Sequence, residues 1–563
     1  MKKLALALAM TLMLSLALAS CGKAPASTPA SGSAPASTPA SSAPAEDEAL
    51  AAFNPDALGI KVVDDKTLEV KLVARTPYFL ELTAFPTYAP VQEKTVTANG
   101  EAWATTPETY IGNGPYKVTE WVPGSKIVYT KNENYWDNKK VIPETINFVL
   151  MEEDAPQLAG FQNKELAFVD SVPNDEIDAL SKGKDFYKSG QIGTYYVSYN
   201  VTAAPFDNKD VRKAFTLAVD RDFICKEIGK SGQIPAGAFV SKGLTDADPA
   251  KEFREVGGDY YDPTKEANEK NLAEAKKILA DAGFPEGEGL GTVTYLYNAG
   301  TGHQAIGEAL QNMWGKLAPK ATFQLESQEW GTFLNTRKTQ EYQVARNGWL
   351  GDYNDPISFL DMWITGGGNN DAGWSNPEYD KLITEIKNSG DAKERMTKMH
   401  EAEDMIFEDW MLCPIYYYVD IFMANETVKK DMIVSPLGFK HFQYVNAPEL
   451  SVCTGPNPDT IDPALNSAVD GGILITHAFE GLYSLDTKGV PVPAQAKDVK
   501  ISEDGLTYTF TLRDDLKWSD GTPLTAKDFA YSWTRAIDPN TASDYAYMFE
   551  CIEGYAEATA QPE

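Results

Sequence analysis

The feature that most constrains the fold is an alternation between two hydrophobic spacings in the middle of the chain. Leu272, Ala275 and Leu279 recur at helical spacing and form one apolar stripe. Segments typical of a strand, a helix and a second strand follow at residues 292–297, 305–314 and 322–326. Because strands that alternate with helices build a parallel sheet covered by helices, the sequence predicts an α/β lobe here.

Two further segments alternate apolar and polar residues around a polar turn, as β-hairpins do. The first is residues 61–73, and the second is residues 501–512, with Asp504 and Gly505 at the turn. These two segments lie near opposite ends of the chain, so the predicted strands are distributed along its whole length.

Length and charge limit the class of protein. The chain has 563 residues, more than one hydrophobic core usually supports, so we expect at least two lobes. The formal net charge of −31 argues against a nucleic-acid partner, because such proteins need clustered cations to displace counterions from phosphates. It also argues against adhesion of the folded body to an anionic membrane. A diffuse negative field favours cationic ligands modestly, although it usually only keeps a protein soluble.

The amino terminus is typical of a secretory signal, which we expect at residues 1–20. Two lysines precede an apolar run at residues 4–18, and small residues lead to Cys21. The segment at residues 18–21 resembles the bacterial lipobox, and this resemblance implies that Cys21 is lipidated. The alternative is an ordinary signal that is cleaved nearby.

A tether is predicted after the signal, at residues 21–46. Beyond the cysteine it consists almost entirely of Ala, Pro, Ser and Thr, which cannot bury enough surface to fold. We therefore expect an exported body on the outer face of the cytoplasmic membrane, or in the periplasm, that the lipid alone anchors. The four other cysteines, whose pairing stays open, are Cys225, Cys413, Cys453 and Cys551.

Five segments carry a family resemblance. They are residues 110–118 (YIGNGPYKV), 132–136 (NENYW), 206–221 (FDNKDVRKAFTLAVDR), 348–356 (GWLGDYNDP) and 516–529 (LKWSDGTPLTAKDF). Together they resemble the oligopeptide- and dipeptide-binding proteins of ABC importers, solute-binding protein family 5. The resemblance implies a two-lobe α/β fold of the periplasmic-binding-protein type II, with an extra small β-rich subdomain.

The order of the segments differs from that family, whose mature chains open with a block that here lies at the carboxyl end. The sequence therefore resembles a circularly permuted member, with new ends near residues 47 and 563. The domains expected on this basis are lobe I with the accessory subdomain from residues 47–210 and 447–563, lobe II mainly from residues 211–420, and a return to lobe I at residues 421–446. We expect residues 450–560 to pack with residues 47–210.

The resemblance implies a substrate-binding lipoprotein that captures short peptides by lobe closure and delivers them to a membrane permease and its ATPases. It implies no cofactor and no catalytic step, and we expect a monomer. Sequence signatures of hydrolases and of nucleotide binding are absent, including Gly-x-Ser-x-Gly, His-Glu-x-x-His and a complete P-loop. Three alternatives stay open: the same fold with a nickel chelate, haem or oligosaccharide, an exported hydrolase, and a ligand-sensing lipoprotein not coupled to transport.

The resemblance also implies a ligand site. Asp352 matches the carboxylate that binds the ligand's α-amine, although a loop aspartate that caps the next helix would look the same, and Asp355 is nearer to that cap. Trp349 would line the site or the core. Residues 344–349 resemble the segment that pairs with the extended ligand, where Gly348 would allow close approach of the backbone.

Further site residues follow from the resemblance alone. Arg346, Arg337 and Lys338 match basic positions able to meet a peptide carboxylate, although Lys338 is equally consistent with a solvated surface residue. Tyr545 matches a tyrosine that contacts ligand in relatives, with core packing as the alternative. Asn457 stands where some relatives have an acidic residue beside the amine pocket.

Overall fold

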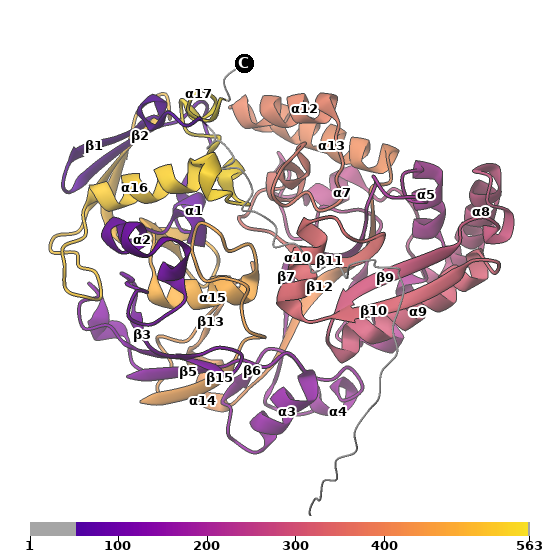
Figure 1. Cartoon of the computed structure of the whole chain (residues 1–563), viewed down its shortest axis with the longest axis horizontal. Helices are drawn as coiled ribbons and strands as arrows, with labels where there is room; N and C mark the ends of the chain where they lie inside the picture. The colour runs from indigo at the N-terminus through magenta and orange to yellow at the C-terminus, as the bar shows by residue number, and fades with distance from the viewer. Residues whose placement is uncertain (1–51, 561–563) are drawn as a thin grey trace, which may run out of the picture. The chain divides into compact units, whose positions relative to one another are not determined.

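The computed structural model describes residues 52–560, and its largest feature is a long mixed β-sheet (Figure 1). Its strands, in spatial order, are β10 (Thr322–Gln328), β9 (Thr292–Asn298), β11 (Val344–Leu350), β7 (Phe186–Tyr199), β12 (Leu412–Ala424), β6 (Phe168–Val169), β15 (Glu449–Cys453), β5 (Thr145–Val149), β4 (Lys126–Lys131) and β3 (Tyr116–Val122). A short strand, β8 (Ile234–Pro235), pairs with β12 beside this path.

The sheet has two halves that meet at one strand pair. We call β3, β4, β5, β15 and β6 the first half-sheet, and β12, β7, β11, β9 and β10 the second half-sheet. They are joined where the end of β12 pairs with β6, at Met423 with Val169 and Ala424 with Phe168. Strands β5, β15 and β6 are parallel to one another, and so are β10, β9 and β11.

Helices surround these strands. In chain order they are α1 (Phe79–Leu82), α2 (Glu93–Asn99), α3 (Asp154–Gln162), α4 (Ile177–Leu180), α5 (Lys209–Leu217), α6 (Arg221–Phe223), α7 (Phe253–Gly257), α8 (Asn268–Asp281), α9 (Thr301–Leu317), α10 (Trp330–Lys338), α11 (Ile357–Leu360), α12 (Pro377–Asn388), α13 (Ala392–Glu408), α14 (Glu426–Asp431), α15 (Val469–Ala478), α16 (Ala526–Ile537) and α17 (Tyr555–Thr559). The predicted order of helix, strand, helix and strand is confirmed as α8, β9, α9 and β10. Ala275 and Leu279 lie on the buried face of α8.

Three smaller sheets complete the strands. The four-stranded sheet has the order β1 (Ile60–Asp64), β2 (Thr67–Lys71), β19 (Thr507–Leu512) and β18 (Ala496–Ile501). The two-stranded sheets are β13 (Ile433–Val434) with β14 (Lys440–His441), and β16 (Tyr483–Leu485) with β17 (Pro491–Pro493). Both predicted hairpins are thus confirmed, and the structure adds that β2 and β19 join them into one sheet.

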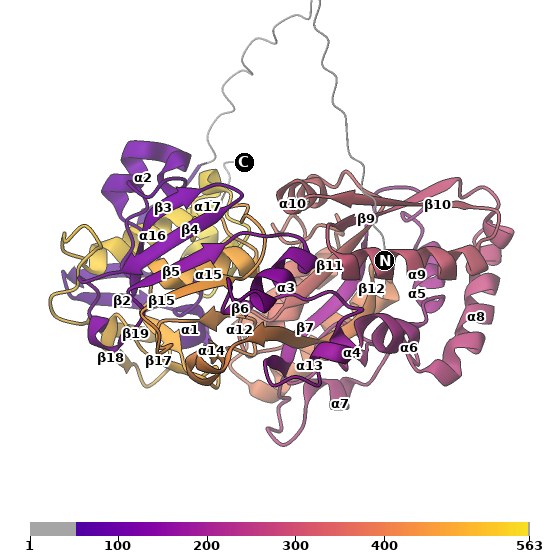
Figure 2. The same ribbon diagram turned by 90° about the horizontal axis from the view of Figure 1, so that it is seen from below.

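The first and last parts of the described chain are interleaved. Strand β15 lies between β5 and β6, and Figures 1 and 2 show the indigo and yellow elements together on one side of the structure. The amide of Asn54 donates a hydrogen bond to the carbonyl of Ala558 at 2.9 Å. Residues 449–560 are therefore packed against residues 52–170 and do not form a separate domain.

The sheet topology differs from the expected domain boundary at residue 210. Strand β7 pairs along its length with β12 and β11, so residues 186–199 group with the second half-sheet. Because β7 has a strand neighbour on each side, backbone hydrogen bonds hold it within the second half-sheet. The family resemblance gave no information on this strand pairing.

No helix within residues 52–560 has both the length and the apolar character needed to cross a membrane. The four cysteines of this part of the chain are buried free thiols.

The Asp462 carboxylate provides a test of the packing within residues 449–560, which Trp103 joins to the first part of the chain. The Asp462 carboxylate accepts hydrogen bonds from Trp103 at 2.8 Å and from two nitrogens of Arg535 at 2.6 and 2.9 Å. We expect Asp462→Asn to lower the free energy of unfolding by about 3–5 kcal/mol, because a largely buried guanidinium loses its counterion. Lys527→Ala is the control, since its pair with Asp65 is exposed and contributes at most about 1 kcal/mol. Equal losses in denaturant titrations of the two variants would contradict the burial of the Asp462–Arg535 pair.

Candidate ligand-binding site

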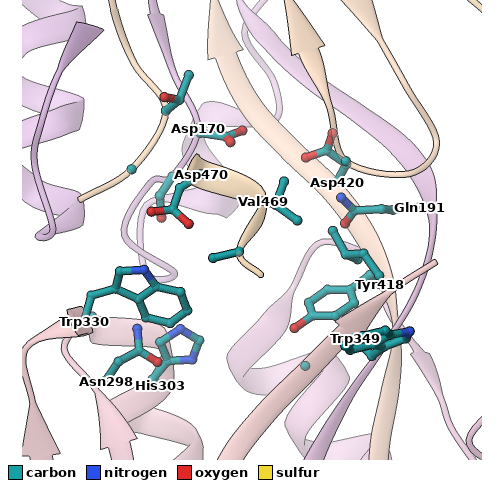
Figure 3. A pocket seen from close by; sticks show the side chains of 18 of the residues that line it. Asp170, Gln191, Asn298, His303, Trp330, Trp349, Tyr418, Asp420, Val469 and Asp470 are labelled. Atoms are coloured by element: carbon teal, nitrogen blue, oxygen red, sulfur yellow. The ribbon is translucent and has the colours of Figure 1, made fainter. Parts of the chain in front are cut away.

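A cavity of about 500 Å³ lies between the walls that the two half-sheets supply (Figure 3). This volume is in the range typical of small-molecule sites, about 300–1,000 Å³. The lining residues that follow parallel strands of the first half-sheet include Glu152, Asp170 and Thr454. Those at or beyond the ends of β9, β10 and β11 include Asn298, Trp330 and Asp352. Both walls thus present the carboxyl ends of parallel strands, where ligands of α/β proteins usually bind.

Asp352 lies just beyond the end of β11 and is 9 % exposed. Its Oδ1 accepts a hydrogen bond from the Tyr545 hydroxyl at 3.0 Å, and its amide donates one to Ser358 at 2.8 Å. Neither partner carries a positive charge. Burial raises the pKa of the Asp352 carboxyl well above its usual value, and the Tyr545 hydrogen bond opposes this only in part. The site therefore holds a carboxylate that lacks a cation.

The helix-cap alternative belongs to the neighbouring aspartate. Asp355 accepts a hydrogen bond from the amide of Ile357, the first residue of α11, at 3.1 Å. Asp355 also pairs with the buried guanidinium of Arg395 at 3.1 Å. Asp352 therefore does not cap α11, and the helix cap does not account for its position.

Strand β11 has an edge without a strand partner beside Asp352. It pairs with β7 over its full length, but with β9 only at Val344 and Ala345. Within the described residues, no strand pairs with the other edge of residues 346–350, and these residues line the cavity. The Tyr418 hydroxyl occupies the space beside Gly348, since an added Cβ would come within 2.3 Å of it. The glycine is therefore needed for the packing of Tyr418, and the backbone edge of residues 346–350 is what remains open to a ligand.

Two of the predicted side chains combine packing with a place in the cavity wall. Trp349 is 8 % exposed, and its indole nitrogen donates to the carbonyl of Ser358 at 2.7 Å. Arg346 lies over the ring of Tyr195, 5.2 Å from its centroid, and its Nε has no hydrogen-bond partner within the described residues. Burial, and after it the positive charge of the neighbouring Arg346, hold the pKa of His303 well below its usual value.

Arg337 also lines the cavity, but its charge is already engaged. It pairs with Asp371 at 3.4 Å, donates a hydrogen bond to Asn347 and lies over the ring of Phe333. These contacts give Arg337 a structural role in supporting β11.

Two residues implied by the family resemblance do not line the cavity. The Lys338 amine lies 2.6 Å from the Asp544 carboxylate and borders a different surface hollow. Asn457 holds a turn, because its side chain accepts from the amide of Gly124 and donates to the carbonyl of Pro458, both at 3.0 Å. Matching to the family could not reveal these local partners. Cys21 and residues 1–51 lie outside the described residues.

Sequence reasoning missed several lining residues. They are Asp170, His303, Trp330, Tyr418, Asp420, Lys440 and Asp470. Asp170 directly follows β6, and His303, Trp330 and Asp470 lie at the starts of helices, so these positions were an available signal because such ends meet at the cavity. Tyr418 and Asp420 lie within β12 and Lys440 within β14, so this signal did not mark them. Within residues 52–560, no group of three or more His, Cys, Asp and Glu side chains is placed to hold a metal ion.

A two-lobed α/β body with a cavity between its parallel strand ends defines a solute-binding protein. Residues 24–371 and 490–561 match the sequence profile of the bacterial extracellular solute-binding proteins, family 5 middle. The match covers more than half of the chain, so the protein belongs to this family.

Relatives with assigned ligands are similar over about two thirds of the chain. The dipeptide-binding protein DppE of Bacillus subtilis is 36% identical over 385 residues, which cover 68% of this chain and 69% of DppE. The oligopeptide-binding protein OppA of the same organism is 34% identical over 379 residues, which cover 66% of this chain and 68% of OppA.

A solved structure has the same architecture. The crystal structure of Haemophilus influenzae OppA in complex with the peptide RPPGFSPFR aligns with a TM-score of 0.62 and 28% identity, covering 69% of this chain and 72% of that one. The two-lobe fold expected from the sequence is therefore confirmed.

The pKa of Asp352 has a consequence for stability. Its carboxyl binds a proton more tightly in the folded than in the unfolded state, so the ligand-free protein loses stability as pH rises through the raised pKa. We expect Asp352→Asn to remove this loss and to raise the free energy of unfolding at neutral pH by about 0.5–2 kcal/mol. Calorimetric melting of both proteins at neutral and mildly acidic pH measures it. A variant that is less stable than the parent at neutral pH would contradict the assignment.

Proposed function

We propose that this protein captures short peptides outside the cell for an ABC importer. The observation that carries the proposal is the unpaired edge of β11 next to a buried carboxylate without a cation. A receptor for many sequences must bind what all peptides share, which is the backbone, the ammonium and the carboxylate. The edge of residues 346–350 would pair with an extended backbone. The names of the similar dipeptide- and oligopeptide-binding proteins support this reading.

The two ends of the peptide have separate partners in the proposal. The α-ammonium binds Asp352, which Tyr545 orients through its hydrogen bond. A charge-assisted bond of this kind is strong because both groups leave water together. The peptide carboxylate binds Arg346, whose Nε has no hydrogen-bond partner within residues 52–560. Ligand contacts made with both walls favour the closed form of the two lobes.

The closed complex would then dock on a membrane permease, whose ATPases supply the energy. The protein itself performs no catalytic step, needs no cofactor and acts as a monomer. Residues 1–20 direct export, Cys21 carries the lipid, and residues 21–46 form the tether. The protein would thus be held at the outer face of the cytoplasmic membrane or in the periplasm.

We further propose that the chain is a circular permutation of the family order, with lobe I formed from both ends of the chain. Three observations support this. The family profile matches in two separate segments, and alignments in chain order cover about two thirds of this chain and of its relatives. The described ends are adjacent, since Asn54 donates to Ala558 at 2.9 Å.

Reversing the permutation tests this proposal. A chain in which residues 449–560 precede residue 52, joined through a short linker, should fold with the same melting temperature within a few degrees. The reason is that the joined ends already touch and the body keeps its contacts. An unfolded or aggregated product would contradict the proposal, and the parent chain purified in parallel is the control.

Acetylation of the ligand's amine tests peptide capture. Isothermal titration of the purified protein with short peptides should show binding. The binding free energy of N-acetylated copies should be about 2–5 kcal/mol less favourable, because they leave the Asp352 carboxylate unpaired. Asp352→Asn should lose a similar amount with the free peptides.

Absence of binding by any free peptide to the folded protein would refute peptide capture and favour a non-peptide ligand. Equal binding of free and acetylated peptides would refute the role of Asp352. In cells, loss of peptide uptake when the permease is deleted separates transport from ligand sensing.

A further inference from the structure

The charges that line the cavity do not balance. The six carboxylates belong to Glu152, Asp154, Asp170, Asp352, Asp420 and Asp470, and the three cations to Arg337, Arg346 and Lys440. A peptide with free ends brings one charge of each sign, so it leaves an excess of three negative charges. This excess needs either structural partners or another cation from the ligand.

Structural partners account for only part of the excess. The Asp154 carboxylate accepts hydrogen bonds from the hydroxyls of Ser171 and Thr301, which satisfy it locally. Glu152 accepts one from the amide of Trp330 at 2.9 Å. These partners are neutral, so they stabilise the carboxylates without cancelling their charge.

The cations are shared out among more carboxylates than they can neutralise. The Lys440 amine is 2.8 Å from Asp170 and 3.4 Å from Asp420, so one cation serves two carboxylates. Arg337 pairs with Asp371, which does not line the cavity, so its charge does not neutralise a lining carboxylate. The negative excess felt by a ligand is therefore larger than the count of lining residues indicates.

Asp470 is a carboxylate of this set with no cation beside it. It lies in the first turn of α15, and its buried Oδ2 has no hydrogen-bond partner within the described residues. Burial raises the pKa of Asp470 to about 6, although the backbone amides of Gly471 and Asp470 and the Trp330 side chain oppose this shift by hydrogen bonding, and the carboxyl is mostly ionised at neutral pH. Trp330, the first residue of α10, belongs to the opposite wall, and its side chain approaches the Asp470 carboxylate. Figure 3 shows both side chains facing the same space.

Two further buried acceptors line the cavity without partners within residues 52–560. They are Oδ1 of Asn298 and Oδ2 of Asp420, and both residues are only 8 % exposed (Figure 3). A buried acceptor left unsatisfied is destabilising, because it has lost its hydrogen bonds to water without gaining a partner. An ammonium has three donors and a guanidinium has five, and neither has an acceptor. The cavity wall therefore offers hydrogen-bond acceptors that an ammonium or a guanidinium could satisfy.

We propose that the preferred ligands are short peptides with a lysine or arginine side chain, which Asp470 and Trp330 receive. The inference rests on the proposed peptide function and adds the chemical class of the ligand side chain. The cation would lie against the indole face and within reach of the carboxylate, an arrangement that cation–π attraction favours. Because Asp470 and Trp330 come from opposite walls, the bound side chain contacts both and stabilises the closed form.

The test compares tripeptides with free amines in which one position at a time is lysine, norleucine or glutamate. Norleucine keeps the apolar stem of lysine and lacks its ammonium. At one position lysine should bind about tenfold tighter than norleucine, and glutamate should bind weaker than norleucine. Asp470→Asn should reduce the lysine-to-norleucine ratio to below about threefold. Asp459→Asn, which removes an exposed carboxylate near Asp470 and outside the cavity lining, should leave the ratio unchanged.

The outcomes separate this inference from the proposed function. If trialanine binds and its N-acetylated form does not, while lysine is no better than norleucine at any position, the side-chain preference is wrong and peptide capture stands. If no free peptide binds, peptide capture fails and the preference with it. A lysine preference that persists in Asp470→Asn overturns the role of Asp470. Circular dichroism and melting temperature report whether that variant is folded, and the ratio in the parent protein tests the preference without any variant.

Discussion

The pairing of β12 with strands on both of its sides is the interaction on which the rest of the structure depends. Most of β12 pairs with β7, and its last residues, Met423 and Ala424, pair with β6. One continuous backbone therefore joins the two half-sheets and brings the carboxyl ends of their parallel strands to a common cavity. Asp420 lies on the same strand, and Lys440 ties it to Asp170 of the first half-sheet. Cavity and connection are thus built from the same residues.

The chemistry of the cavity follows from desolvation more than from shape. Asp352 and Asp470 are carboxylates that the fold does not pair with a cation, and burial raises the pKa of each. A protein normally pairs such groups because an isolated buried charge is expensive. A ligand that supplies the missing cations would relieve this unfavourable burial, and the relief would add to its binding affinity. The unpaired edge of β11 applies the same logic to backbone hydrogen bonds.

Sequence reasoning reached the fold and part of the site. Hydrophobic spacing located α8, β9, α9 and β10, and the family resemblance placed Asp352, Trp349 and Tyr545 at the cavity. It could not show a side chain's nearest partner, such as the Asp544 carboxylate that pairs with Lys338. Asp470 escaped notice because an aspartate in the first turn of a helix usually serves the helix dipole. Only the tertiary structure shows that it faces a cavity.

The position of β15 in the chain has a consequence for the order in which the protein can fold during synthesis. Strand β15 fills the place between β5 and β6, yet it is made some three hundred residues after β5. The second half-sheet is complete once β12 has emerged, whereas the first must wait for residues that are among the last to be translated. Strands β5 and β6 keep unpaired edges during that interval. Such edges invite aggregation, so the first half-sheet is the part of the nascent chain most exposed to it until β15 arrives.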